Sequence, residues 1–174
     1  MKKNIEIIIM LTLTIFFSGC TNQEDLFLET GNKYNINHKT LRSICKTESN
    51  FHANVINVNK SLFDIQKGPH YFSNSISANL YMDYVLDPLL LNYDIGLCQI
   101  NKTHLARLKL DNEDLLDEGN NIDVAGKIYK YNLGACDGDL MCALSMYNTG
   151  RKSSTVGRRY ANKVLKSRKS LYGY

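Results

Sequence analysis

An amphipathic stretch near residue 40 places the strongest constraint on how this chain can fold. One face of a helix through this stretch would carry, at spacings i, i+3, i+4 and i+7, the residues Leu41, Ile44, Cys45 and Glu48. Asn37 precedes the pattern and is expected to cap the helix at its N-terminus. The last member of this apolar face is a glutamate. The pattern therefore predicts a carboxyl group that either turns to solvent at the helix end or is held away from water.

Three further segments repeat the helical period. Apolar residues recur on one side through residues 120–136 and 139–148, and an apolar face with Val156, Tyr160 and Val164 runs through residues 155–167. Gly134 and Gly150 are expected to end the first two of these helices. Strand signals are weak and fall between residues 55 and 100. With 174 residues, of which 44% are hydrophobic, the sequence predicts a mainly α, single compact domain with a small β element in residues 55–100.

The N-terminal residues have the pattern of an export signal. Two lysines precede the eleven-residue apolar run IIIMLTLTIFF, which is shorter than the roughly 20 residues that span a bilayer. The next residues, FSGC, resemble the lipobox of bacterial lipoproteins, in which Cys20 would be acylated; ordinary signal-peptidase cleavage nearby is the alternative. We therefore assign residues 1–19 to a signal peptide, residues 20–32 to a tether, and residues 33–174 to the domain.

Four cysteines remain after Cys20: Cys45, Cys98, Cys136 and Cys142. An even number in an exported chain favours two disulfides, for which three connectivities are possible. Cys136 and Cys142 are the easiest pair to close because only five residues separate them. That pairing would leave Cys45 to bond with Cys98.

Charge and histidine spacing exclude several classes of function. The net charge is +4, and residues 151–174 hold eight Lys/Arg and no acid, which indicates a solvated face or attraction to an anionic polymer or lipid surface. No nucleic-acid-binding motif is present, so we expect no nucleic-acid partner. The histidines show no H-E-x-x-H pattern, and we expect neither a metal site nor a cofactor. These histidines are His38, His52, His70 and His104.

A buried carboxyl group at position 48 would have a specific chemical use. Loss of hydration disfavours the charged form and raises the pKa of a carboxyl group. A carboxyl group that stays protonated near neutral pH can donate a proton to a leaving oxygen, as the general acid of a glycosidase does. Glu48 is therefore the candidate catalytic residue.

Four motifs in order resemble those of the soluble lytic transglycosylases, which have a goose-type-lysozyme-like α+β fold. They are ICKTESNFHANVIN, DIGLCQIN, NNIDVAGKIY and ALSMYNTG, which begin at residues 44, 94, 120 and 143. The resemblance implies that Glu48 cleaves the β-1,4 bond between N-acetylmuramic acid and N-acetylglucosamine in peptidoglycan. The expected product is 1,6-anhydro-N-acetylmuramic acid, formed with help from the substrate's own acetamido group.

The same resemblance implies roles for the other motif residues. Tyr147 would hydrogen-bond near Glu48 and fix the orientation of the acid. Gln99 and Asn101 would bind sugar polar groups from a short extended segment. Three further candidates for contact with substrate, each with an alternative role in a cap or turn, are Ser49, Asn148 and Gly96.

Two departures from the family pattern bear on mechanism. Cys98 stands where the family usually has methionine, so a bond to Cys45 would hold the catalytic helix against the cleft wall. Residues 57–93 form an insertion, for which we expect a local hydrophobic subdomain; a lid, a sugar-stacking platform and a docking site are the alternatives. A hydrolytic muramidase would need a second carboxylate, and the local candidates are Asp64, Asp83, Asp87 and Asp94.

The small size and the export signal resemble the transglycosylases of secretion, pilus and conjugation systems. The expected role is local opening of the cell wall for such an apparatus, which would then be a partner. The expected location is the periplasm, with a lipid anchor in the outer membrane if Cys20 is acylated. A scaffold that binds peptidoglycan without cleaving it is the alternative outside enzymes.

Overall fold

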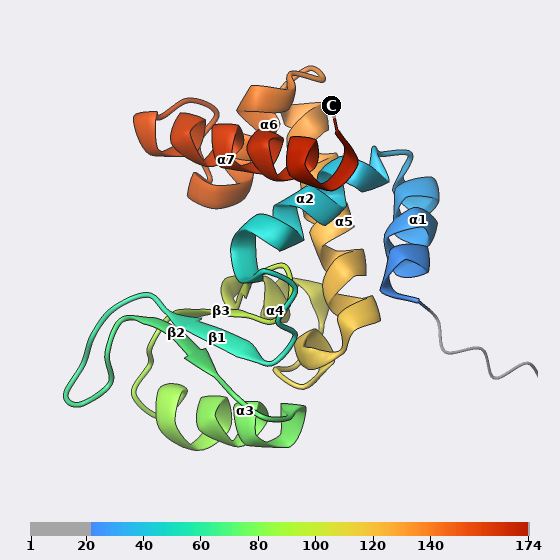
Figure 1. Ribbon diagram of the computed structural model, residues 1–174. Helices are drawn as coiled ribbons and strands as arrows, with labels where there is room; N and C mark the ends of the chain where they lie inside the picture. The colour runs from blue at the N-terminus through green and yellow to red at the C-terminus, as the bar shows by residue number, and fades with distance from the viewer. Residues whose placement is uncertain (1–21, 174) are drawn as a thin grey trace, which may run out of the picture.

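The computed structural model describes residues 22–173, which form a helical part and a smaller sheet-containing part (Figure 1). The helical part contains α1 (Gln23–Tyr34), α2 (His38–Ser49), α5 (Glu118–Ala135), α6 (Leu140–Thr149) and α7 (Thr155–Tyr172). The predicted signal peptide and Cys20 lie outside the described residues. Within residues 22–173, no helix has the length and apolar character needed to cross a membrane.

The second part is built on a four-stranded antiparallel sheet. Its strands, in the spatial order β2-β1-β3-β4, are β2 (Gly68–Tyr71), β1 (Val55–Val58), β3 (Tyr93–Ile95) and β4 (Ile100–Asn101). The short helices are α3 (Ser75–Tyr81), the π-helical turn η1 (Met82–Leu86), α4 (Thr103–Leu108) and the 3-10 turn η2 (Asp114–Leu116). The prediction of a mainly α fold with a small β element between residues 55 and 100 is confirmed.

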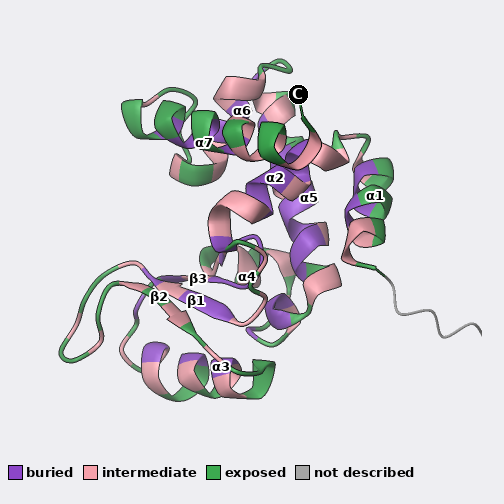
Figure 2. Ribbon diagram, in the orientation of Figure 1, coloured by how far each residue is buried: buried purple, intermediate pink, exposed green. Residues whose placement is uncertain are grey.

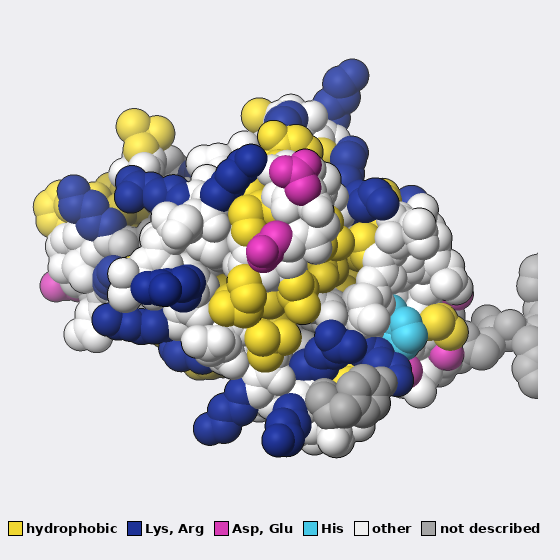
Figure 3. All heavy atoms as spheres, turned by 90° about the horizontal axis from the view of Figure 1, so that it is seen from above, with side chains coloured by type: hydrophobic (Ala, Val, Ile, Leu, Met, Phe, Trp, Pro, Cys, Tyr) yellow, Lys and Arg dark blue, Asp and Glu magenta, His cyan; other side chains and the backbone are white. Residues whose placement is uncertain are grey.

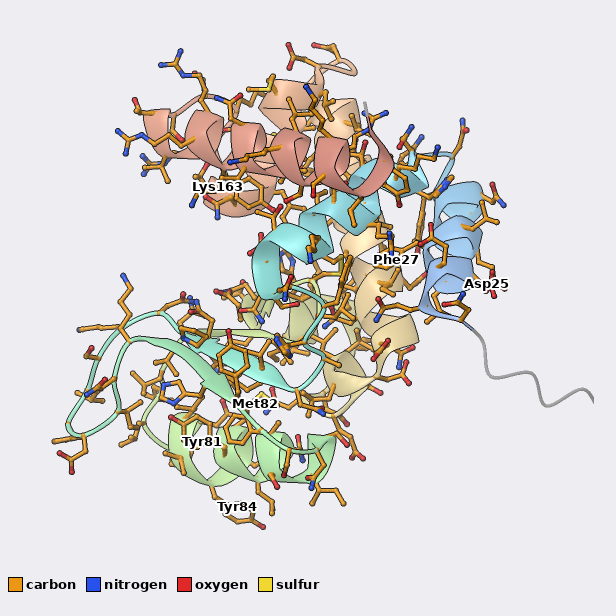
Figure 4. The ribbon with its side chains drawn as sticks, viewed as in Figure 1. Asp25, Phe27, Tyr81, Met82, Tyr84 and Lys163 are labelled. Atoms are coloured by element: carbon orange, nitrogen blue, oxygen red, sulfur yellow. A yellow bond between two sulfur atoms is a disulfide. The ribbon has the colours of Figure 1, made fainter. Side chains whose placement is uncertain are left out.

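The insertion contributes β2, α3 and η1 to this sheet-containing part. Met82 and Leu86 on η1 are fully buried with Ile56 and Val58 of the central strand β1. Figure 4 shows Tyr81 and Met82 turned toward the sheet and Tyr84 turned away from it. The buried residues of the insertion therefore belong to the same core as α1, α2 and α5, and a separate function for the insertion stays a prediction.

Helix α2 follows the sequence pattern closely. The Asn37 side chain accepts a hydrogen bond from the backbone N–H of Thr40, as an N-cap does. Leu41, Ile44 and Cys45 are fully buried, as their shared helical face predicts. In Figure 2 the buried residues of α2 and α5 face each other inside the helical part.

The predicted tether is wrong, because residues 23–34 form helix α1. Phe27 on α1 is fully buried, and Figure 4 shows it turned toward α5. Gly126 on α5 permits this close packing, since a Cβ there would lie 2.4 Å from Thr30 Cγ2. The buried face of α1 consists of Phe27, Thr30 and Gly31. A face with so little apolar surface gives a weak periodic signal in the sequence.

Two details of the other helices also differ from expectation. Gly134 lies inside α5, and the residues with left-handed backbone after this helix are Asp137 and Gly138. Val156 in the first turn of α7 is 60% exposed, whereas Tyr160 and Val164 are buried as predicted. Gly150 does end α6 in the left-handed conformation.

The basic C-terminal segment forms an exposed face of α7 and its preceding loop. Seven of its eight cations are exposed, and Arg168 is half-buried. Figure 3, which looks down on the molecule from above, shows Lys and Arg side chains around a hydrophobic area with few acidic groups among them. The segment is thus a solvated cationic face, and attraction to an anionic polymer stays a prediction.

Candidate active site

A cleft of about 880 Å³ lies where α2, the sheet, α4, α5 and α6 meet. Of the residues predicted to contact substrate, five line it: Glu48, Gln99, Asn101, Tyr147 and Asn148. Ser49 and Gly96 do not line the cleft. Four segments that are far apart in the sequence therefore meet at one surface.

Glu48 occupies the last turn of α2, and its carboxyl group is withdrawn from water. Burial raises its pKa to about 7, and the negative charge of Asp94 acts in the same direction. A hydrogen bond from Tyr160 and the positive charge of Lys163 oppose this rise. The group is therefore close to half protonated at neutral pH, which suits a residue that must both donate and accept a proton.

The tyrosine that hydrogen-bonds to the Glu48 carboxyl group is Tyr160. The Tyr160 hydroxyl on α7 donates a hydrogen bond of 2.6 Å to Glu48 Oε1. The Tyr147 hydroxyl donates instead to the backbone carbonyl of Cys98, over 3.0 Å. Tyr147 thus ties α6 to the turn beneath the cleft, and burial together with the charge of Glu48 raises the pKa of its hydroxyl. The predicted role of Tyr147 in orienting Glu48 stays a prediction.

The side chains of Ser49 and Asn121 also hold the turn of residues 96–99 in place. Ser49 Oγ donates to the carbonyl of Leu97 over 2.6 Å. The buried Asn121 accepts a hydrogen bond from the backbone N–H of Cys98 and donates to the carbonyls of Ile95 and Leu115. These bonds satisfy polar backbone groups that would otherwise be unpaired in the interior. Ser49 and Asn121 thus shape the cleft from behind.

Gly96 has a steric role in this turn. Its φ is +74°, and a Cβ there would lie 2.5 Å from Asn121 Nδ2 and 2.6 Å from the carbonyl oxygen of Leu115. A side chain would displace the Asn121 contacts as well as strain the backbone. Gly96 therefore lies against Asn121 and Leu115 in a turn, which was the alternative to contact with substrate.

Gln99 and Asn101 line the cleft, but much of their hydrogen-bonding capacity is already used. Gln99 Nε2 donates to the carbonyls of Gly96 and Val55. Asn101 Nδ2 donates to Asp94 Oδ1 over 2.7 Å, and its Oδ1 accepts from Thr103. The predicted extended conformation of this segment is wrong at Gln99, whose φ is +54°. Contact of both residues with sugar stays a prediction.

A disulfide joins α2 to the turn beneath the cleft. Cys45 is bonded to Cys98, and Cys136 is bonded to Cys142, as the favoured pairing predicted. Cys45 precedes Glu48 by three residues, which is about one helical turn. The Cys45–Cys98 bond therefore fixes the last turn of α2 beside the residues that Tyr147, Ser49 and Asn121 hold.

Asp94 is the only one of the four candidate second carboxylates that lines the cleft. Its two oxygens accept hydrogen bonds from Asn57 Nδ2 and Asn101 Nδ2. Asp87 forms an ion pair with Lys102 and accepts a hydrogen bond from Tyr93. Asp83 accepts hydrogen bonds from Asn79 and Asn112, and Asp64 is exposed. A carboxylate that shares the cleft with Glu48 is thus present.

Several residues that line the cleft or contact Glu48 were not singled out by the sequence. Tyr160 was predicted only to face inward, and its polar hydroxyl was the available signal that it needed a buried partner. Four more lie outside the quoted motifs, on α4 and α5: Arg107, Leu108, Tyr131 and Asn132. Three lie within those motifs but had no assigned role: Lys127, Ile128 and Met146. Across residues 22–173 there is no group of three or more His, Cys, Asp or Glu side chains arranged to hold a metal ion.

Comparison with protein-family models matches residues 25–169 to the transglycosylase SLT domain. A search among curated proteins found no match. The matched region includes the cleft, both disulfides and α1, which the sequence had placed in a tether. Because this region covers most of the chain, the protein belongs to the SLT transglycosylase family, whose members are lytic transglycosylases that act on peptidoglycan.

Proposed function

We propose that Glu48 acts as both general acid and general base in cleavage of the β-1,4 bond between N-acetylmuramic acid and N-acetylglucosamine. The observation that carries this proposal is a cleft-lining carboxyl group with a pKa of about 7, held by the hydroxyl of Tyr160. In its protonated form Glu48 gives its proton to the glycosidic oxygen as the bond from that oxygen to C1 breaks. The acetamido group of the same sugar stabilises the positive charge at C1.

The second step regenerates the acid. Ionised Glu48 removes the proton from the C6 hydroxyl of the muramic acid residue, and the C6 oxygen forms a bond to C1. The products are a 1,6-anhydro end and a free hydroxyl on the departing sugar, and Glu48 is protonated again. No water is consumed. A group with a pKa near 7 passes between the two forms at little cost at neutral pH.

Mass spectrometry of digested peptidoglycan tests this mechanism. Residues 22–174 of the wild type should release anhydro-muropeptides, and the Glu48→Gln variant should release none. Glutamine keeps nearly the same shape but has no proton to give at neutral pH, so the variant isolates the chemistry of the carboxyl group. Anhydro products from the variant at the wild-type rate would remove Glu48 from the catalytic role.

Asp94 supports a second candidate, a hydrolytic muramidase. It shares the cleft with Glu48, and its charge contributes to the raised pKa of that residue. In such an enzyme Asp94 would assist water or the sugar cation, and the product would carry a reducing end. The same digest separates the two candidates, since Asp94→Asn should abolish reducing ends if hydrolysis takes place. A scaffold that binds peptidoglycan would give no products, and its binding would not respond to Glu48→Gln.

We further propose that the enzyme opens the wall locally for assembly of a secretion, pilus or conjugation apparatus. The support is the resemblance to small transglycosylases of those systems together with the expected export signal. The proposed location is the periplasm, with a lipid anchor in the outer membrane. Mass measurement of the mature N-terminus, with Cys20→Ala as control, tests the anchor. Failure of apparatus assembly in a Glu48→Gln strain would support the role.

A further inference from the structure

Two cations line the wall of the cleft that α4 and α5 form. Arg107 lies on α4 and Lys127 on α5, and both side chains belong to exposed residues. Neither makes an ion pair within the part of the chain that the structure describes. By contrast, Lys33, Arg42 and Lys102 each pair with an acidic group. The charges of Arg107 and Lys127 are therefore available to a ligand in the cleft.

Arg107 is held in place by a group that leaves its charge intact. Its Nη2 donates a hydrogen bond of 2.9 Å to Nδ1 of His104, which also lines the cleft. Burial and the charge of Arg107 lower the pKa of His104, so the imidazole is neutral at pH 7 and can accept at Nδ1. A neutral histidine orients the guanidinium without cancelling it. Arg107 therefore has a fixed orientation, unlike an arginine that contacts only solvent.

The substrate of this family carries its negative charge away from the sugar backbone. The N-acetylated sugars are neutral, whereas the stem peptide attached to the muramic acid lactyl group bears carboxylates. Guanidinium and ammonium groups are the side chains that bind carboxylates with charge-assisted hydrogen bonds. Next to Lys127, Ile128 and the 67% exposed ring of Tyr131 add apolar surface to the same wall. Such a surface suits a peptide that has both charged and apolar parts.

We propose that Arg107 and Lys127 form a subsite for the carboxylates of the stem peptide, so that the enzyme prefers strands with peptides to stripped strands. This inference rests on the proposed function, because it concerns the substrate of the same cleft. Lys163, which acts on Glu48 from α7, is not part of the subsite because it does not line the cleft. Figure 4 shows Lys163 on the separate helix α7.

Binding measurements on a Glu48→Gln background test the subsite independently of turnover. The two probes are soluble glycan strands with intact stem peptides and the same strands stripped by an amidase that cuts the lactyl–peptide bond. We expect the peptide-bearing strands to bind about five- to tenfold more tightly, which is the scale of two exposed charge pairs. This preference should shrink as salt is added, because exposed charges are screened.

The decisive comparison uses two variants with the same net charge. Arg107→Gln with Lys127→Gln should bring the ratio of the two affinities close to one. Lys109→Gln with Lys130→Gln should keep the wild-type ratio. Lys109 follows the last residue of α4 and Lys130 lies on α5, and both are exposed but do not line the cleft. An unchanged ratio in the first variant, or an equal loss of affinity for both probes, would overturn the subsite. Absence of products from the wild type would count against the proposed function alone.

Discussion

The hydroxyl of Tyr160 lies 2.6 Å from Oε1 of Glu48, and this contact links two helices that are 112 residues apart in sequence. Its donor comes from the interior face of α7, whereas Glu48 ends α2. The α7 helix also meets α2 through the hydroxyls of Thr47 and Ser167, which are 2.9 Å apart. The orientation of the acid therefore depends on the packing of a helix that contributes no residue to the cleft itself.

Tyr160→Phe tests this contact. Loss of the hydrogen bond should raise the pKa of Glu48 further, because the bond favours its ionised form. The alkaline limb of the pH–rate profile should shift to higher pH, and the rate should fall about tenfold through poorer orientation of the acid. Initial rates of anhydro-muropeptide release from pH 5 to 9 measure both effects. A profile that keeps the wild-type limb would show that Tyr160 has no influence on Glu48.

Glu48→Gln should stabilise the protein, and the effect should depend on pH. The folded-state pKa of about 7 lies above the ordinary glutamate value of 4.5, so the folded state binds more protons than the unfolded state between these two pH values. The free energy of unfolding of the wild type consequently falls as pH rises through this window. The variant does not lose stability in this way. Its free energy of unfolding should therefore exceed that of the wild type by about 1–3 kcal/mol above pH 7.

Thermal unfolding at pH 4 and pH 8 checks this prediction. The melting temperature of the variant should rise relative to the wild type by about 2–4 °C for each kcal/mol at pH 8, and little at pH 4. Asp123→Asn is a suitable control, since Asp123 pairs with Lys33 and neither residue lines the cleft. Equal differences between Glu48→Gln and wild type at both pH values would contradict the raised pKa.

The two disulfides should differ in their effect on stability and on catalysis. In the chain-entropy treatment, a loop of 53 residues corresponds to about 4 kcal/mol and one of 6 residues to about 2 kcal/mol. Replacing Cys45 and Cys98 by serine should therefore cost more stability than replacing Cys136 and Cys142. Only the replacement of Cys45 and Cys98 should also lower the rate of anhydro-muropeptide release, measured at a temperature where both variants are folded. Urea unfolding and initial rates measure the two effects, and an equal rate loss in both variants would refute a specific role beside Glu48.

The sequence was sufficient for features that depend on local pattern. The cap at Asn37, the apolar face of α2 and the unusual position of Glu48 follow from residues within one or two turns of each other. The family motifs further indicated which segments meet at the cleft. Cysteine number and spacing favoured the observed disulfide pairing.

The sequence did not predict contacts that depend on tertiary packing. A tyrosine on an inward face has the same pattern whether it fills the core or binds an acid, so Tyr160 could not be separated from Tyr147. Gln99 adopts a left-handed backbone conformation, which glutamine does not favour and which the neighbouring residues do not predict. Helix α1 was missed because its buried face relies on Thr30, which packs against Gly126, and on Gly31, which packs against His38. These residues do not form an apolar stripe.

Gly157 sets the distance between α6 and α7, and therefore the position of Tyr160 one turn later. A Cβ at residue 157 would lie 1.9 Å from Ser145 Oγ and 2.7 Å from Ser145 Cβ. Ser145 is buried and its hydroxyl donates to the carbonyl of Arg151, so it has little freedom to move away. Gly157→Ala should cost about 1–3 kcal/mol through overpacking and should also shift Tyr160 away from Glu48.

The second effect separates Gly157→Ala from an ordinary destabilising change. The variant should lose rate at a temperature where it remains folded, and the alkaline limb of its pH–rate profile should move to higher pH, as in Tyr160→Phe. Gly134→Ala is the matched control, because a Cβ there meets nothing within 4 Å and Gly134 lies within helix α5. Alanine should stabilise that position slightly. If Gly157→Ala lowered stability but kept the wild-type pH profile, the packing of α6 on α7 would not control the acid.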